Sequence, residues 1–430
     1  METTVGNYFV SNYPPFSTWS KDDLPLLESA LEVRAPGEPI ALYVHLPFCR
    51  QRCHYCYYRV YPSRDREAVD RYIDGLLSEL KEWRRRPVTA DRRLIAAYFG
   101  GGSPSYLEPD QLDRLLLGIR RMLPWMTLEE CAFECDPGSI DRAKLDVLYE
   151  HGVTRLSIGT QTFTPAALSA IGRLQTPEMT VEAYRSAIAA GFEEINIDLL
   201  AGLPGETVET WRRTIDRVIA LAPPCVTVYQ LELSWNSILH TRARSGRNAP
   251  QLPDWQTKRE WVDEAFATLE AAGYSVVSGY MAVKDPSSWR FIYTVEHFWR
   301  GGDLLAIGES SFGHFRGVHY QNLDRQDTYL AAVESGRLPL RRARSLTFDE
   351  TLRRELILAL KTGRADREWF LERHGVDIAQ EFAKPLKELE EAGFLRIEND
   401  GVTLTRDGLL RVDSLLDRFY RPEHRGVRYS

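Results

Sequence analysis

Three cysteines stand close together near the start of the chain, and their spacing is typical of a metal site. Cys49, Cys53 and Cys56 follow the pattern C-x3-C-x2-C within eight positions. Iron–sulfur clusters are held by cysteine thiolates, usually four of them. Three thiolates can hold three irons of a cubane and leave the fourth iron open to another ligand. Zinc is an alternative at this point, because His54 lies inside the loop and could add a fourth ligand.

An apolar run directly before the cysteines predicts the element that positions them. Leu42, Tyr43 and Val44 have the β-branched and aromatic character of a buried strand. Pro47 predicts the end of that strand, because proline cannot donate a hydrogen bond to a sheet. We therefore expect the cysteines to lie in a loop that follows a buried strand.

Polar groups recur where later strands are predicted to end. The run GGGSP (residues 100–104) follows one strand, Glu134 ends the next, and Gln161 and Asp198 come at the ends of two more. Ligands of parallel α/β folds bind at the carboxyl ends of the strands. Each group alone is more often a turn, a cap or a solvated side chain, but together they predict one ligand site at this edge.

Strands and helices alternate through the first half of the chain. After the first strand, we predict strands over residues 94–99, 129–134, 155–158, 194–199 and 226–233, and helices over 69–83, 112–123, 180–190 and 208–222. Such alternation indicates parallel βαβ units. Six units predict an α/β fold whose core is a partial (β/α)6 barrel rather than a closed barrel of eight.

The pattern changes after residue 254. A helix over 261–272, a strand over 275–280, an aromatic segment at 289–299 and a glycine-rich run at 300–308 lead to a predicted linker at 336–345. Helices over 352–360, 368–373 and 378–392 and a hairpin at 399–401 then suggest a winged helix. We divide the chain into an N-terminal arm (1–40), the barrel (41–240), an α+β extension that completes the active site (241–340) and a winged-helix-like cap domain (345–430).

Charge and composition limit the kinds of binding partner that we expect for this chain. The net charge is −7, and residues 347–420 hold 12 Lys and Arg against 16 Asp and Glu, which is opposite to a phosphate-binding surface. We therefore expect no nucleic-acid partner. No secretory signal and no membrane-spanning run is predicted. The other cysteines, Cys131, Cys135 and Cys225, are interpreted as buried thiols, and a reducing cytoplasm is the expected compartment.

The cysteine loop with its strand, ALYVHLPFCRQRCHYCYY (residues 41–58), closely resembles the cluster loop of radical S-adenosylmethionine (SAM) enzymes. It is most similar to the oxygen-independent coproporphyrinogen III oxidase family. GGGSP resembles that family's GGGTP element, with Ser103 keeping the hydroxyl of threonine, and further motifs match in order over residues 41–233. The resemblance implies a [4Fe–4S] cluster on Cys49, Cys53 and Cys56, and an electron donor of the flavodoxin or ferredoxin type.

The resemblance also implies how two SAM molecules are held. Tyr43, Gly101 and Glu134 match contacts of the first SAM. The positions that match contacts of the second SAM are Gly102, Ser103, Gln161, Arg173 and Asp198. Tyr55 would also contact the second SAM, and Ile307 would lie near an adenine. Cleavage of the first SAM to methionine and a 5′-deoxyadenosyl radical would begin the reaction.

Three branches of the family share this scaffold. The decarboxylating oxidases carry a further cysteine just after the third, where this chain has Tyr57 and Tyr58. The haem-binding chaperones carry a His-Asn-x-x-Tyr-Trp motif, for which His297 is misplaced. The aromatic sequence after Cys56 favours the third branch, class C radical SAM methyltransferases. From sequence we thus expect transfer of a methyl or methylene carbon to an unsaturated small-molecule metabolite, with the oxidase and the chaperone as alternatives.

Overall fold

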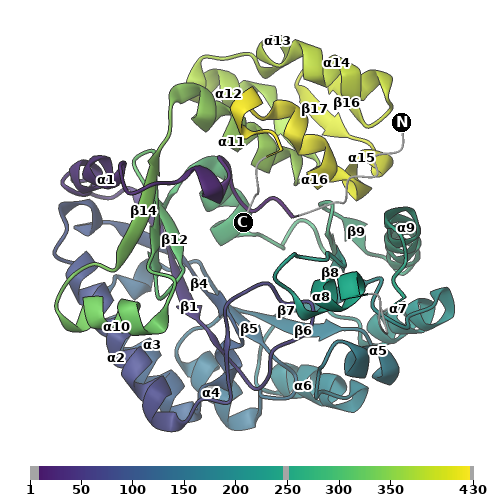
Figure 1. Ribbon diagram of the computed structural model, residues 1–430. Coiled ribbons are helices and arrows are strands. Elements are labelled where there is room, and N and C mark those ends of the chain that lie inside the picture. Colours follow the sequence, from purple (N-terminus) through teal and green to yellow (C-terminus); the bar gives the residue numbers. More distant parts are fainter. Residues whose placement is uncertain (1–8, 246–250, 427–430) are drawn as a thin grey trace.

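A computed structural model describes residues 9–245 and 251–426, and it is built around one large sheet (Figure 1). The twelve strands of this sheet lie in the order β14-β13-β12-β11-β1-β4-β5-β6-β7-β8-β10-β9. In the described residues, seven neighbouring strands are parallel: β11 (Asp303–Ile307), β1 (Pro39–Leu46), β4 (Arg93–Gly101), β5 (Glu130–Cys135), β6 (Arg155–Gln161), β7 (Glu194–Ala201) and β8 (Cys225–Gln230). The predicted α/β partial barrel is confirmed. No helix among the described residues is long and apolar enough to cross a membrane.

Amphipathic helices cover the outer face of the barrel, as the βαβ pattern predicts. They are α2 (Arg66–Trp83), α3 (Pro109–Met122), α4 (Arg142–Glu150), α5 (Pro165–Ala170), α6 (Pro177–Ala189), α7 (Val208–Leu221) and α9 (Trp255–Ala271). In α2, Asp65 caps the amino end by accepting from the Ala68 amide, and Tyr72, Leu76 and Trp83 are buried. Burial of these apolar faces against the strands forms the main core and leaves the strand ends free for a ligand site.

Strand β11 is the main feature that the sequence pattern did not predict. Its residues were interpreted only as a glycine-rich run, yet β11 pairs in parallel with β1 in the middle of the sheet. The buried ion pair between Arg92 and Asp303, with Nη2 and Oδ2 2.9 Å apart, ties it to the barrel. A five-residue strand that pairs with a partner more than 250 residues earlier leaves no local periodicity to recognise.

Antiparallel strands complete the sheet on both sides. Strands β12 (Phe312–Phe315), β13 (Val318–Asn322) and β14 (Leu340–Ser345) follow β11, and β10 (Met281–Val283) and β9 (Ser275–Val276) lie beyond β8. The predicted linker at 336–345 was therefore wrong over its second half, which forms β14. Helix α10 (Gln326–Glu334) connects β13 and β14, and the aromatic segment contains the short helices η5 (Ile292–His297) and η6 (Phe298–Arg300).

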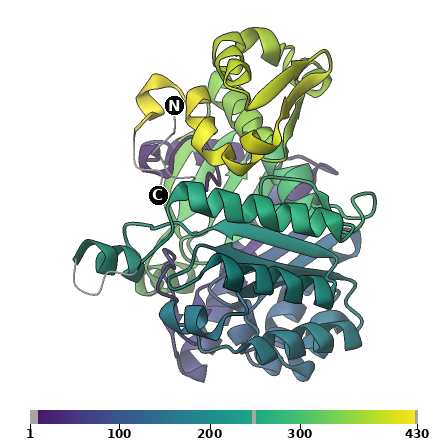
Figure 2. The ribbon, with the colours of Figure 1, turned by 90° about the vertical axis from the view of Figure 1, so that its right-hand side faces the viewer.

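The C-terminal part stands above the barrel as a separate cluster of helices around a small sheet (Figures 1 and 2). Its helices are α11 (Phe348–Leu360), α12 (Arg367–His374), α13 (Ile378–Glu381), α14 (Ala383–Glu391), α15 (Arg406–Leu410) and α16 (Val412–Leu415). Its three strands lie in the order β15 (Arg364–Asp366), β17 (Gly401–Leu404) and β16 (Leu395–Glu398). The hairpin of β16 and β17 turns where the sequence Asn-Asp-Gly predicted it.

The N-terminal segment links the barrel to this upper part. The segment predicted as an arm contains helix α1 (Leu24–Leu31), and its first eight residues lie outside the described ones. Val10 and Tyr13 are buried in the core of the C-terminal part. The Val10 amide donates to Asp413 Oδ1 (2.9 Å), and the Val10 carbonyl accepts from Lys361 Nζ (2.7 Å). Contacts of opposite chain ends thus close the space above the strand ends.

Candidate active site

The cysteine loop begins where β1 ends and is fastened at several points. Strand β2 (Phe48–Cys49) pairs in parallel with β3 (Tyr61–Pro62), which brings the two ends of the loop together. In the middle of the loop, the His54 amide donates to the Ile171 carbonyl (2.8 Å). The Ser103 hydroxyl donates to Cys49 Sγ across 3.7 Å, so the glycine-rich run lies directly beside the first thiol. The loop is therefore held in place by protein contacts alone.

The donor set favours a cluster over zinc. Among the described residues, no group of three or more His, Cys, Asp or Glu side chains converges on a single ion. His54 points elsewhere, because its Nδ1 lies 3.0 Å from the Ala170 carbonyl oxygen. Three thiols on one loop can each bind one iron of a cubane. Burial raises the pKa of Cys49 to about 12 and that of Cys56 to about 11, and a bound metal favours the thiolate form.

The glycine-rich run approaches the cysteine loop so closely that side chains could not fit. Gly101 has a φ of +115°, and a Cβ there would lie 2.6 Å from His45 Cε1. A Cβ at Gly102 would lie 2.5 Å from the Phe48 carbonyl oxygen and 3.0 Å from Cys49 Sγ. The missing side chains let the backbone of the run lie directly against His45, Phe48 and Cys49, so its amide groups stay close to the first thiol. We call this close approach at Gly101 and Gly102 the cradle.

The first predicted SAM group is brought together around Glu134. The Gly101 amide donates to Glu134 Oε2 (3.2 Å), and the Tyr98 hydroxyl donates to Glu134 Oε1 (2.8 Å). Tyr43 stacks on Tyr98 with ring centres 6.1 Å apart, and its hydroxyl lies 3.1 Å from His45 Nδ1. Burial raises the pKa of Glu134 to about 7, and the negative charge of Asp198 adds to the rise. A polar group so poised can bind the hydroxyl or amino group of a ligand.

The second predicted SAM group centres on Arg173. Its Nη1 donates to the Gly159 carbonyl (2.8 Å), and its Nη2 lies 3.1 Å from Asp136 Oδ2. Its Nε is buried without a hydrogen-bond partner. Gln161 is adjacent, because a Cβ at Gly159 would lie 3.2 Å from Gln161 Nε2 and 3.4 Å from Arg173 Nη2. The unsatisfied Nε indicates room for a further acceptor, as an anionic ligand would provide.

Asp198 completes this group from within strand β7. Its carboxylate accepts from the Ser157 hydroxyl (2.7 Å) and from Asn196 Nδ2 (2.8 Å). Burial raises the pKa of Asp198 to about 6, although these hydrogen bonds and the charge of Arg173 oppose the rise. The negative charge of Asp198 contributes to the raised pKa of Glu134, so the two predicted groups lie close to each other.

Two predicted residues pack against apolar clusters of the core. Tyr55 packs against an apolar cluster that includes Ile171 and Leu203, beside the charge of Arg173. Ile307 ends β11 opposite Val44 and is fully buried in the main core. Sequence reasoning missed His45, Tyr98 and Asp136, which position Tyr43, Glu134 and Arg173. All three lie within or next to the motifs already identified, so their position beside these motifs could have pointed to them.

His297 has a structural role. Its Nε2 lies 2.7 Å from the Asp303 carbonyl oxygen, and its ring fills the space where a side chain at Gly302 would stand. Burial lowers the pKa of His297 below its ordinary value. The Asp303 carbonyl thus engages one nitrogen of the ring, and the buried ring packs against Gly302.

Comparisons with known proteins agree with this geometry. A family model described as the radical SAM superfamily matches residues 43–218, and one described as the HemN C-terminal domain matches residues 346–411. The oxygen-independent coproporphyrinogen III oxidase of Pseudomonas aeruginosa is 30% identical over 94% of this chain and 91% of its own length. The heme chaperone HemW of Bacillus subtilis is 29% identical over 88% of this chain and 98% of its own.

A solved structure gives the same result for the whole fold. The coproporphyrinogen III oxidase HemN of Escherichia coli superposes with a TM-score of 0.82 at 27% identity and covers 96% of both chains. The relatives that span the chain carry oxidase or chaperone names, so the predicted methyltransferase branch gains no support, and the oxidase alternative fits better. Membership of the radical SAM superfamily implies a [4Fe–4S] cluster and SAM as cofactors. The chain belongs to the oxygen-independent coproporphyrinogen III oxidase family of the radical SAM superfamily.

Proposed function

We propose that this protein oxidatively decarboxylates a propionate side chain of a reduced tetrapyrrole, as the coproporphyrinogen III oxidases in its family are named for doing. The observation that carries the proposal is the whole-chain match to the Escherichia coli oxidase, which extends over the barrel and the C-terminal part alike. A superfamily match limited to the barrel would support radical chemistry without pointing to a substrate.

The residues around the cysteine loop fit the cofactors that this reaction needs. Cys49, Cys53 and Cys56 would each hold one iron of the [4Fe–4S] cluster, and the backbone of Gly101 and Gly102 lies directly beside this loop. When the reduced cluster and SAM are bound, they supply a 5′-deoxyadenosyl radical, which can abstract a hydrogen atom. The chain's own task is to bind, orient and shield the reacting groups.

The first SAM would be bound by Tyr43, Gly101 and Glu134. Glu134 already accepts from the Gly101 amide and from Tyr98, so its carboxylate is held in one orientation. With a pKa of about 7, it can act either as a hydrogen-bond acceptor or, when protonated, as a donor. Such preorganisation fixes the ligand without a side-chain nucleophile or base.

A second SAM would occupy the neighbouring group. The residues assigned to it are Gly102, Ser103, Gln161, Arg173 and Asp198. Tyr55 would also contact this second SAM, and Ile307 would lie near an adenine. The unpartnered Nε of Arg173 and its guanidinium charge support an anionic ligand at this place. Asp136 and Asp198 flank the arginine and would direct it.

In the proposed reaction, a hydrogen atom leaves the β-carbon of a propionate and becomes part of 5′-deoxyadenosine. The substrate radical then loses carbon dioxide and passes one electron to an acceptor, which leaves a vinyl group. A flavodoxin- or ferredoxin-type protein would supply the electron that starts each turnover. This chain has Tyr57 and Tyr58 where the oxidase motif has an additional cysteine. The assay therefore tests whether decarboxylation occurs without that cysteine.

The test is an anaerobic assay of reconstituted protein with coproporphyrinogen III, SAM and a reductant. We expect carbon dioxide, vinyl-bearing product and 5′-deoxyadenosine to form together. S-adenosylhomocysteine formed in amounts matching 5′-deoxyadenosine would contradict the proposal, because it is the product of methyl transfer. Stoichiometric haem binding with a Soret band and no decarboxylation would also contradict it.

A further inference from the structure

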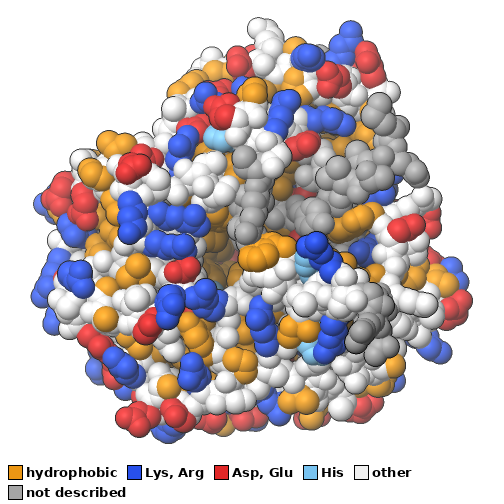
Figure 3. Space-filling model, viewed as in Figure 1, with side chains coloured by type: hydrophobic (Ala, Val, Ile, Leu, Met, Phe, Trp, Pro, Cys, Tyr) orange, Lys and Arg blue, Asp and Glu red, His pale blue; other side chains and the backbone are white. Residues whose placement is uncertain are grey.

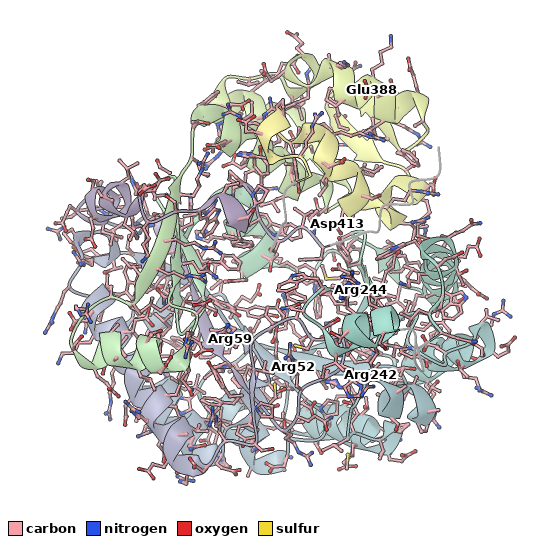
Figure 4. The ribbon with its side chains drawn as sticks, viewed as in Figure 1. Arg52, Arg59, Arg242, Arg244, Glu388 and Asp413 are labelled. Atoms are coloured by element: carbon pink, nitrogen blue, oxygen red, sulfur yellow. The ribbon has the colours of Figure 1, made fainter. Side chains whose placement is uncertain are left out.

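Four arginines lie on the face of the molecule that carries the central hollow (Figures 3 and 4). Arg52 and Arg59 come from the cysteine loop, and Arg242 and Arg244 come from helix α8 (Ile238–Ser245). We call these four residues the arginine rim. In the part of the chain that the structure describes, none of them forms a salt bridge with Asp or Glu. A local excess of positive charge is unexpected in a chain whose net charge is −7.

The rim is a built feature, because α8 is docked onto the cysteine loop. Arg52 Nη2 donates to the Asn236 carbonyl (3.2 Å), and Asn236 Nδ2 donates to the Tyr57 carbonyl (2.8 Å). The Leu239 amide donates to the His54 carbonyl (2.9 Å). The Nε of Arg52 is buried and has no partner. These contacts hold the arginines of two separate elements on one surface.

Among the described residues, Arg59, Arg242 and Arg244 form no ion pair, although the charge of Arg59 acts on the nearby carboxylate of Glu309. Arg59 Nη1 donates to the main-chain oxygen of Asp324 (2.7 Å), while the carboxylate of Asp324 pairs with Arg341 (2.6 Å). Arg242 Nη1 lies 3.2 Å from His54 Nδ1, and Arg244 is exposed. The guanidinium groups thus retain donors for an anion that comes from outside the chain.

An exposed aromatic pair lies between the arginines in sequence and beside the cluster cysteines. Tyr57 and Tyr58 stack with ring centres 4.4 Å apart, and their hydroxyl groups are 3.0 Å apart. They are 37% and 45% exposed, so both rings are open to contact from outside the chain. Stacked rings offer a flat apolar surface to a planar or cyclic ligand.

We propose that the arginine rim binds the carboxylates of the substrate while Tyr57 and Tyr58 contact its apolar ring. The geometry points to a cyclic, largely apolar compound with several carboxylates, the chemistry of a tetrapyrrole with propionate side chains. The inference rests on the proposed function and assigns its specificity to Arg242 and Arg244 of α8 together with residues of the cysteine loop that are not cluster ligands. Arginine is suited to the role, because its planar fork binds a carboxylate through two parallel hydrogen bonds.

An acidic electron-donor protein could also be attracted by a basic surface. The exposed tyrosine pair favours the small molecule, because it places an apolar contact among the charges and directly after Cys56. A substrate must also reach the cofactor cradle, which lies beside the same loop. The donor protein is therefore the competing outcome of the experiment.

The experiment measures binding without turnover. Coproporphyrin III, the oxidised and fluorescent form of the macrocycle, is titrated into the anaerobic holoenzyme, and its tetramethyl ester serves as a ring without carboxylates. The variants are Arg59→Gln, Arg242→Gln, Arg244→Gln and the triple substitution. Arg185→Gln on the outer helix α6 is the matched control, because Arg185 is exposed and forms no salt bridge with any residue that the structure describes. Iron content and circular dichroism verify that each variant is folded and carries its cluster.

We expect each single substitution to weaken coproporphyrin III binding about three- to tenfold and the triple substitution to weaken it further. Added salt should weaken wild-type binding, and the ester should bind all forms alike. Wild-type affinity in the single and triple variants would overturn the inference and leave the proposed function standing. Normal porphyrin binding with slower cluster reduction by flavodoxin would assign the rim to the donor instead. If the wild-type protein binds no coproporphyrin III, this inference fails, while the decarboxylation assay still decides the proposed function.

Discussion

Arg173, which follows helix α5, and Asp136, which follows strand β5, form a largely buried ion pair with Nη2 and Oδ2 3.1 Å apart. The same guanidinium donates to the Gly159 carbonyl, and only its Nε has no partner. The arginine is therefore fixed in place before any ligand arrives. This arrangement leads to a test of the second SAM.

Substitution of Arg173 should reduce the number of SAM molecules bound. We expect equilibrium dialysis of anaerobic wild-type protein to give about two SAM per cluster and Arg173→Ala to give one, because the guanidinium is assigned to the second molecule. Asp136→Asn, which keeps the shape but removes the charge that orients Arg173, should weaken the second binding event by about tenfold. One SAM in the wild-type protein would contradict the assignment.

Each cluster cysteine should be essential for iron. Reconstituted wild-type protein is expected to contain about four irons and four sulfides per chain. Cys49→Ala, Cys53→Ala or Cys56→Ala should lose the cluster, since a cubane held by two thiolates is not retained. Cys131→Ala and Cys225→Ala remove buried thiols on strands β5 and β8 and serve as controls. Full zinc occupancy, or iron retained in Cys53→Ala, would refute the cluster.

Gly101→Ala should abolish SAM cleavage. The new Cβ would meet the His45 ring at 2.6 Å and would impose a φ of +115° on an alanine. Gly205→Ala is the control, because Gly205 also has a positive φ of +77° but no atom lies within 4 Å of its Cβ position. We expect Gly205→Ala to cost about 1 kcal/mol of stability while SAM cleavage persists. Equal activity in the two variants would show that the cradle is not used.

Stability should fall as the pH rises through the range in which the site carboxylates ionise. The pKa of Glu134 is about 7 and that of Asp198 about 6 in the folded protein, above the values near 4 of an unfolded chain. Between these values the unfolded chain has released protons that the folded protein still holds, so the free energy of unfolding decreases from about pH 4 to pH 7 and then levels off. Denaturation of cluster-free protein checks this. Glu134→Gln should show a smaller decrease, and an unchanged slope would contradict the prediction.

The buried ion pair of Lys361 and Asp413 should be necessary for the contact between the chain ends. Their side chains are 0% and 1% exposed, and Nζ and Oδ1 are 2.8 Å apart. Lys361→Met leaves an unpaired buried carboxylate and should cost about 3–5 kcal/mol in denaturant unfolding. Lys361→Met combined with Asp413→Asn should cost less. Lys387→Met, which removes the exposed pair with Glu391, should change stability by less than about 1 kcal/mol, and a similar loss in both would refute the argument.

The sequence by itself determined the parts of the site that are continuous along the chain. The strand before Cys49, the thiol spacing and the polar residues Glu134, Gln161 and Asp198 were all predictable, because in parallel α/β units the loop after each strand lies at the same edge. The family and its cofactors followed from these local motifs. The choice among its branches did not, because a motif describes the cofactor site more closely than the substrate site.

Tertiary structure alone decided the features that join distant segments. Strand β11 is placed beside β1 by a buried ion pair between Arg92 and Asp303, and no local periodicity announces such a pairing. The ion pair of Arg173 with Asp136 and the docking of α8 onto the cysteine loop likewise join segments that are far apart in the sequence. Side chains that are ordinary in sequence, such as His45 and Arg242, acquire their roles from these contacts. The physical reason is that hydrogen bonds and ion pairs act over a few ångströms, and only the folded chain brings these partners within reach.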